Sequence, residues 1–179
     1  MSSDTHNILK HWREAVPKDR FAHLIRDTER AFRRALQFRL AVHKVPFGQW
    51  SFLRILWESD GLTQKELSER AGVMEPTTFA AMKAMEAQGY ITRKQRPTNK
   101  KNIYVYLTTK GRALKTRLVP HAEETNQISS RNVDATDLAI ARKVLLTMIA
   151  NLADDEQRQV EMSASKPASP KKKAANQLN

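Results

Sequence analysis

The stretch that decides the fold runs from residue 61 to residue 111 and reads GLTQKELSERAGVMEPTTFAAMKAMEAQGYITRKQRPTNKKNIYVYLTTKG. Thr63 and Glu66 have the spacing of a capping box, in which a hydroxyl and a carboxylate satisfy free amides at a helix start. Gly72 can end this helix in a left-handed conformation. Pro76 suits the first position of a second helix, where its missing N–H is no loss. We therefore expect two short helices about four residues apart.

The residues after these helices have the pattern of strands. Apolar residues and tyrosines alternate over 103–107. Residues 91–102 contain no acid, and Pro97 and Asn99 favour a turn, so we expect a loop between two strands. This loop gathers five cations: Arg93, Lys94, Arg96, Lys100 and Lys101. The order helix, turn, helix, strand, loop, strand predicts a winged helix-turn-helix.

These segments resemble the MarR family of bacterial transcription regulators. The shared pattern consists of Gln49, LTQKEL (62–67), MEAQGYITR (85–93) and NKKNIYVYLTTKG (99–111), in the family's order. The resemblance covers roughly residues 45–115 and implies DNA binding. One departure lies in the wing, where Asn99, Lys100 and Lys101 stand at positions that often read Asp-Arg-Arg in the family. The charge is kept, but the Asp–Arg bracing of the wing tip is missing.

Helical patterns flank this segment on both sides. Residues 20–44 and 47–59 carry apolar side chains at steps of three and four, and 110–131 is helical in spite of Pro120. Asp134 is expected to cap a last helix that runs through Leu152. Its apolar positions keep the narrow spacing of a helix-to-helix seam: Leu138, Ala141, Leu145, Met148 and Leu152.

The expected fold is therefore mainly α with a small β-wing. We divide it into a leader over 1–19, dimerisation helices over 20–44 and 112–162, and a winged helix-turn-helix lobe over 45–111. Residues 163–179 are poor in apolar side chains and contain lysines without an acid, which predicts a disordered basic tail.

Composition narrows the range of partners. The formal net charge of +12 favours a polyanion, although charge alone would also permit RNA or anionic lipid. With no cysteine, disulfides and thiol-based sensing are excluded. No apolar run approaches about 18 residues and the N-terminal residues lack a signal-peptide core, so we expect a soluble, cytoplasmic protein without a membrane partner.

The second short helix is the candidate reading element. On a helical wheel one face is expected to be buried in the core, and the opposite face carries mainly small side chains and one cation. Phe79 on this outer face could contact a thymine methyl, or it could pack on the preceding helix. The candidate contacts to base edges and phosphates on the two helices are Gln64, Pro76, Thr77, Phe79, Ala80 and Lys83. Those of the wing are Arg93, Arg96, Asn99, Lys100 and Lys101, although a charge run can also be a solvated face.

Residues 39–54 are the candidate ligand segment. Five side chains there suit an aromatic carboxylate, with rings to stack and a guanidinium to bind the acid: Arg39, His43, Phe47, Trp50 and Arg54. The alternative is that the rings are ordinary core, Arg54 a structural ion-pair partner and His43 a loop histidine. The segment is similar to the branch of the family that controls degradation of aromatic acids, such as hydroxybenzoates, phenylacetates or nicotinates.

No enzyme or cofactor is expected, because motifs for a nucleophile or a phosphate loop are absent. The five histidines lack metal-ligand spacing to one another, which leaves open only a zinc site built from distant His and Glu residues.

We expect a homodimeric repressor that binds a pseudo-palindromic operator and is released by a small anionic aromatic effector. One alternative is a sequence-tolerant architectural DNA-binding protein without ligand control. Another is a winged helix used for protein contact, which the positive charge disfavours.

Overall fold

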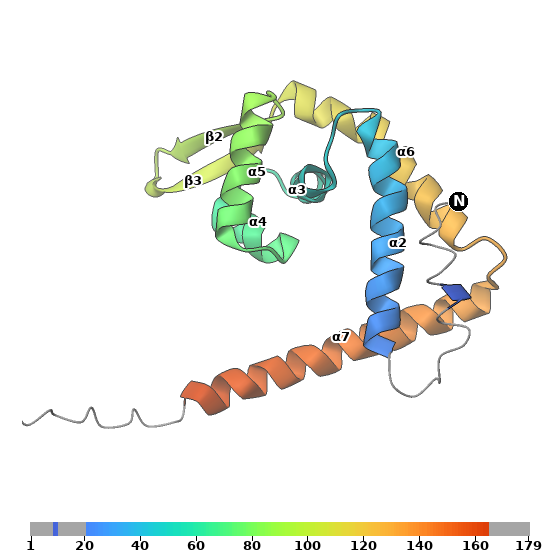
Figure 1. Ribbon diagram of the computed structural model, residues 1–179. Helices are drawn as coiled ribbons and strands as arrows, with labels where there is room; N and C mark the ends of the chain where they lie inside the picture. The colour runs from blue at the N-terminus through green and yellow to red at the C-terminus, as the bar shows by residue number, and fades with distance from the viewer. Residues whose placement is uncertain (1–8, 11–20, 165–179) are drawn as a thin grey trace, which may run out of the picture. The chain divides into compact units, whose positions relative to one another are not determined.

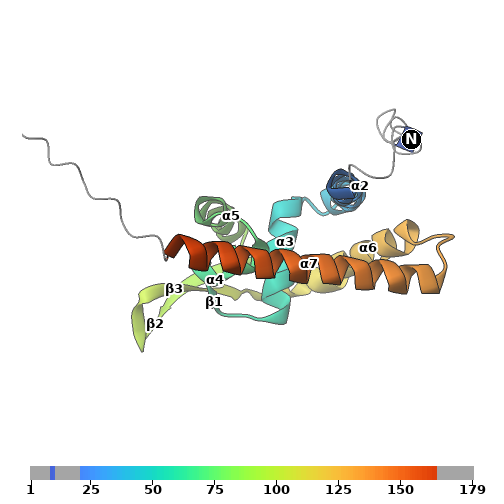
Figure 2. The same cartoon turned by 90° about the horizontal axis from the view of Figure 1, so that it is seen from below.

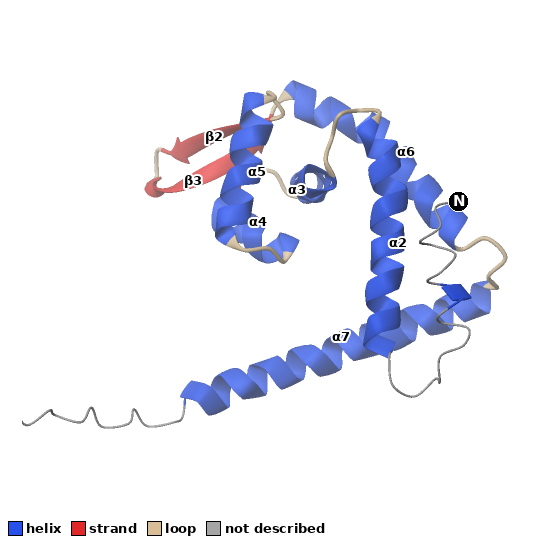
Figure 3. Cartoon of the chain, in the orientation of Figure 1, coloured by secondary structure: helices blue, strands red, loops and turns tan. Residues whose placement is uncertain are grey.

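Helices make up most of the chain, as the red strands and blue helices of Figure 3 show. The computed structural model describes residues 9–10 and 21–164. Its elements are α2 (Phe21–Ala41), α3 (Phe47–Glu58), β1 (Leu62–Thr63), α4 (Gln64–Ala71), α5 (Glu75–Ala87), β2 (Ile91–Arg96), β3 (Asn99–Leu107), α6 (Thr109–Ser129) and α7 (Ala135–Ala164) (Figure 1). The predicted mainly α fold with a small β-wing is confirmed. The leader, apart from Leu9 and Lys10, and the tail from residue 165 lie outside the described residues.

The helix-turn-helix forms by the local signals of its sequence. The Thr63 backbone N–H donates to Glu66 Oε2 at 2.7 Å, and the Glu66 backbone N–H donates to Thr63 Oγ1 at 3.2 Å. Gly72 ends α4 with a φ of 63°. Pro76 is the second residue of α5 rather than the first, because Met74 is the N-cap. The capping box and the glycine turn are confirmed.

The sheet is antiparallel, with strand order β1-β3-β2. β2 pairs with β3 from Ile91 opposite Leu107 to Arg96 opposite Asn99. β1, which the sequence analysis missed, pairs only with Val105 and Tyr104 of β3. Beyond Tyr104 the sheet is therefore a two-stranded ribbon, which extends away from α3, α4 and α5 (Figures 1 and 2).

One hydrophobic core joins the described elements up to Ser129, which form one compact unit. Leu40, Leu53, Met82, Ile91 and Leu118 contribute one side chain each from α2, α3, α5, β2 and α6, and each is at most 1% exposed. Burial of a side chain of this size stabilises a fold by about 1.5–3 kcal/mol. The winged lobe is thus held to α2 and α6 by its own apolar residues.

α6 lies close to the backbone of Tyr90, the residue before β2, at Gly111. A Cβ at this position would overlap the backbone carbonyl of Tyr90, so only glycine fits there. The Trp57 indole N–H donates to the Gly111 carbonyl at 3.0 Å, which ties α3 to the same point. α6 then continues through Pro120 to Ser129.

The described residues from 130 to 164 belong to a second unit, built on α7. The Asp134 carboxylate accepts the Thr136 backbone N–H at 2.7 Å, which lowers the pKa of Asp134. The predicted helix end at Leu152 is wrong, because α7 continues to Ala164 and includes the first two residues of the expected tail. Residues 153–164 contain no glycine or proline that would stop it.

None of the 30 residues of α7 is buried. Leu138 and Leu145 are each 42% exposed, and Leu152 is 70% exposed. The apolar seam predicted from the sequence is therefore exposed within the unit that α7 forms.

Candidate nucleic-acid interface and ligand cavity

α5 presents two faces of opposite character. Thr78, Met82 and Met85 are buried, as the helical wheel predicts. The side chains predicted to point away from the core do so: Pro76, Phe79, Ala80, Lys83 and Ala87 are all exposed, and Thr77 at the helix start is exposed as well. The outer face combines small residues with a single ammonium group, which suits close approach to a surface such as a DNA groove.

Phe79 is not a core residue, since 55% of it is exposed. Its ring lies under the guanidinium of Arg93, with 5.8 Å from Cζ to the ring centroid. Arg93 is itself held by Glu86, which accepts from Nε at 2.9 Å and from a terminal nitrogen at 2.6 Å. This hydrogen bonding lowers the pKa of Glu86. The Glu86–Arg93 pair thus joins α5 to β2 beside the exposed ring.

The cations of the wing do not lie in a loop, which corrects the prediction for residues 91–102. The turn comprises only Pro97 and Thr98, and the cations lie on β2 and β3. The alternation of the ribbon, rather than a flexible tip, therefore decides which cations face outward.

The arginines and the lysines of the wing differ in their contacts. Arg93 binds Glu86, and Arg96 donates to the Tyr106 hydroxyl and to the Gly61 carbonyl. In contrast, the ammonium groups of Lys94, Lys100 and Lys101 make no ion pair or hydrogen bond within the described part of the chain, and all three residues are exposed. The lysines are the wing cations that are free to bind an anion.

The Asn99 side chain binds the backbone of residues that follow it at the start of β3. Its Oδ1 accepts the backbone N–H of Lys101 at 3.1 Å and that of Asn102 at 3.3 Å. The bracing that the Asp-Arg-Arg pattern would supply is therefore replaced by an asparagine that binds backbone amides. Gln64, the first residue of α4, is half-buried next to the N-cap.

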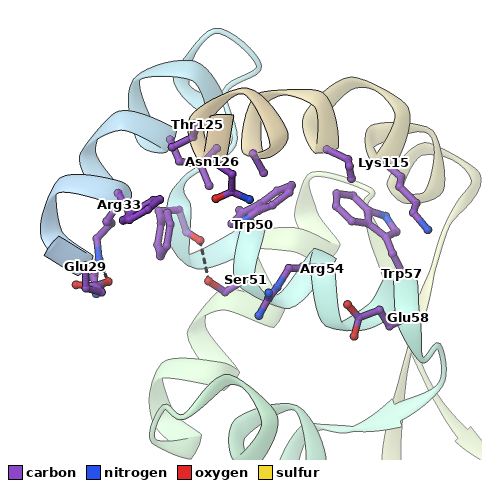
Figure 4. A pocket seen from close by; sticks show the side chains of 15 residues that line it. Glu29, Arg33, Trp50, Ser51, Arg54, Trp57, Glu58, Lys115, Thr125 and Asn126 are labelled. Carbon is purple, nitrogen blue, oxygen red and sulfur yellow. Dashed lines mark hydrogen bonds and ion pairs between the residues drawn. The ribbon is translucent and has the colours of Figure 1, made fainter. Parts of the chain in front are cut away.

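A cavity of about 550 Å³ lies between α2, α3 and α6 (Figure 4). Three of the five predicted ligand residues line it, namely Phe47, Trp50 and Arg54. Trp50 is only 6% exposed and meets Trp57 edge to face, with 5.6 Å between ring centroids. Trp50 is therefore a buried core residue, as the alternative interpretation of the sequence predicts, and it also forms a wall of the cavity.

Arg39 and His43 do not line this cavity, contrary to the prediction. The Arg39 Nε donates to Glu124 at 2.9 Å, and this bond lowers the pKa of the Glu124 carboxyl. His43 and His121 share a hydrogen bond of 2.9 Å between their Nε2 atoms. Both partners belong to α6, about eighty residues away in sequence, so local spacing could not reveal them.

The cavity has charged residues that the sequence analysis missed. Arg33 lines the cavity from α2 and is paired with Glu29, and Lys115 lines its edge from α6 (Figure 4). Within the described residues, Arg54 and Lys115 make no ion pair or hydrogen bond through their side chains. The cavity therefore combines aromatic walls with two cations that have no counter-ion among the described residues, and Glu58 is an acid on the same lining.

No group of three or more His, Asp or Glu side chains among the described residues is arranged to hold a metal ion. No helix among them is long and apolar enough to cross a membrane.

Known proteins share both the sequence pattern and the fold. The profile of the MarR family matches residues 47–103. The HTH-type transcriptional regulator TtmR of Methylorubrum extorquens (strain PA1) is 30% identical over 127 residues, which cover 70% of this chain and 61% of TtmR. The homoprotocatechuate degradative operon repressor of Escherichia coli is 30% identical over 82 residues, which cover 46% of this chain and 55% of that repressor. The chain thus spans less than two thirds of the length of either relative.

A solved MarR-family regulator from Listeria monocytogenes, in complex with a 26-mer DNA, has a TM-score of 0.70. The match covers 85% of this chain and 99% of that one at 22% identity, and so shows a common fold. The segment matched by the family profile contains α3, the helix-turn-helix and part of the wing. With the sequence relatives and the common fold, it establishes that the chain belongs to the MarR family of winged-helix transcription regulators.

Proposed function

We propose that this protein is a homodimeric, cytoplasmic transcription repressor that binds a pseudo-palindromic DNA operator and is released by a small aromatic acid. The observation that carries the proposal is the pairing of an exposed, small-residue face on α5 with a wing whose lysines are free. α5 would read base edges in the major groove, and the wing would contact phosphates beside it.

The dimer is supported by apolar surface that the single chain leaves uncovered. α7 buries no residue, and the first half of α2 also exposes large apolar side chains, such as Phe21 and Leu24. A second copy would cover such surface, and a two-fold axis would then relate the two α5 helices of the dimer. Two half-sites read together give an operator more specificity than one.

The aromatic acid is supported by the cavity. Trp50, Trp57 and Phe47 offer ring surfaces, and Arg54 and Lys115 offer cations that no acid in the described part of the chain pairs with. A guanidinium can bind a carboxylate through two parallel hydrogen bonds. The relative from Escherichia coli is named for repression of a homoprotocatechuate degradative operon.

DNA binding can be tested by sequencing the genomic fragments that the purified protein retains at fixed salt. A shared pseudo-palindrome among the fragments would support a regulator with an operator. Fragments without any common sequence would favour the alternative, a sequence-tolerant architectural protein.

The ligand can be tested with hydroxybenzoates, phenylacetates, cinnamates and nicotinates. A compound that binds the cavity should quench tryptophan fluorescence and weaken operator binding, because a ligand shifts an equilibrium by its differential affinity for the two states. Arg54→Gln should lose this response. Arg39→Gln is the matched control, since Arg39 is paired with Glu124 outside the cavity. Equal responses of both variants, or no response to any acid at millimolar concentration, would remove the ligand from the proposal.

A further inference from the structure

Arg96, the last residue of β2, directs its guanidinium back along the sheet. Its Nε donates to the Tyr106 hydroxyl at 2.9 Å, and a terminal nitrogen donates to the Gly61 carbonyl at 2.9 Å. Its Cζ lies 3.8 Å from the centroid of the Tyr104 ring. One side chain thus joins β2 to β3 and to the residue before β1. We call Arg96, Tyr104, Tyr106 and Gly61 the Arg96 clamp.

The clamp uses properties that only arginine has among the basic residues. A guanidinium is planar, so it can stack on a ring while its edge donates hydrogen bonds in fixed directions. A lysine has a compact ammonium on a flexible chain, and it could not stack on Tyr104 and make both bonds at once.

Gly61 is shaped to receive this side chain. Its φ of 76° is one that other residues rarely adopt. A Cβ at this position would lie 2.7 Å from Tyr106 Cε1 and 3.1 Å from a terminal nitrogen of Arg96. The chain thus leaves space for the guanidinium where a side chain would exclude it.

The clamp acts on the part of the wing that lacks a third strand. β1 pairs only with Tyr104 and Val105, so the residues from Asn99 to Ile103 have only β2 beside them. A two-stranded hairpin is marginally stable by itself in water. The ladder is also irregular between Gln95 and Arg96. The contacts of Arg96 therefore hold the ribbon where the sheet supports it least.

We propose that Arg96 is a positioning residue: it fixes the direction of the wing, so that Lys94, Lys100 and Lys101 reach the DNA, and does not itself bind a phosphate. This inference rests on the proposed DNA-binding function. It differs from the expectation that Arg96 is one more phosphate contact. The two roles can be separated, because a phosphate contact depends on charge and the clamp depends on shape.

The test compares Arg96→Lys with Arg96→Gln, using operator binding over a range of salt concentrations. If Arg96 positions the wing, both variants should weaken binding by a similar factor, on the order of tenfold. Tyr106→Phe, which changes no charge, should weaken binding in the same direction by a smaller factor. Lys101→Gln is the control for a direct contact, and its log-affinity versus log-salt slope should fall in magnitude by about 0.9.

Hydrogen exchange of the free protein gives a second readout that needs no DNA. Amides of residues 94–103 should exchange faster in Arg96→Lys and in Tyr106→Phe than in the wild type, and Lys101→Gln should leave them unchanged. Suppose that Arg96→Lys bound the operator like the wild type, while the log-affinity versus log-salt slope of Arg96→Gln fell in magnitude by about 0.9. Arg96 would then be a direct phosphate contact, and the inference would be wrong. Unchanged exchange in Arg96→Lys would also overturn it. If the wild-type protein bound no DNA, the proposed function would fall, and faster exchange in Arg96→Lys would still establish the clamp.

Discussion

The helices α3 and α7 both carry leucine and isoleucine side chains, yet α3 lies in the core and α7 has no buried residue. Half of the twelve residues of α3 are buried, and none of the thirty of α7 is. Leu53 on α3 is 0% exposed and Leu145 on α7 is 42% exposed. The apolar surface of α3 is therefore covered by the fold of one chain, whereas that of α7 needs another surface.

This difference separates two sources of stability. Contacts of α3 form within one chain and do not depend on protein concentration. If α7 is covered by a second copy, its contribution depends on concentration, because association stabilises by mass action.

The largest effect is expected at Leu145. Leu145→Glu would place an unpaired charge in a helix-to-helix seam, at a cost of more than about 5 kcal/mol. The protein should become monomeric or unfold, which light scattering and circular dichroism would distinguish. Thr147→Glu is the matched control, because Thr147 is exposed and lies on the opposite side of α7. A stable dimer of Leu145→Glu would show that this seam is not the interface.

The core of the lobe should respond in a different way. Leu53→Ala should lower the free energy of unfolding by about 2–5 kcal/mol, since a cavity adds to the lost burial. Urea unfolding at two protein concentrations should give the same loss. A loss that grew on dilution would mean that α3, too, depends on a partner chain.

The exposed face of α5 should matter for DNA and little for folding. Phe79→Ala should weaken operator binding by roughly 1–3 kcal/mol if the ring reads a base, with a smaller change on unrelated DNA. Val42→Ala removes another exposed apolar side chain, at 80% exposure, and should change neither. A drop of several degrees in the melting temperature of Phe79→Ala would instead identify the ring as part of the packing.

The smallest effect is expected at the capping box. Thr63→Ala should cost about 1 kcal/mol of stability at neutral pH. The pKa of Glu66 is lowered by the Thr63 backbone N–H and by its hydroxyl, so the carboxylate stabilises the fold above its ordinary pKa and loses this effect as the pH falls. The difference between wild type and variant in chemical unfolding should therefore shrink in acid. Thr116→Ala, an exposed position in α6, is the control, and a difference independent of pH would exclude the Glu66 contribution.

Local signals predicted the local structure. The capping box, the left-handed Gly72 and the alternation of 103–107 each involve residues a few positions apart, and each structure formed as expected. The partners of Arg39 and His43 could not be predicted in this way, because they lie on α6. The same holds for Arg96: its charge is evident in the sequence, but its contacts with Gly61 and Tyr106 depend on how the sheet is assembled.

The crossing at Gly111 has a mechanical consequence. Because the backbone of α6 meets the backbone of Tyr90 with no side chain between them, this point cannot absorb strain by a change of rotamer. Tyr90 directly precedes β2, so a rotation of α6 would be transmitted to the root of the wing. Gly111 thus marks the point where the helix that borders the cavity lies directly against the backbone that leads into the wing.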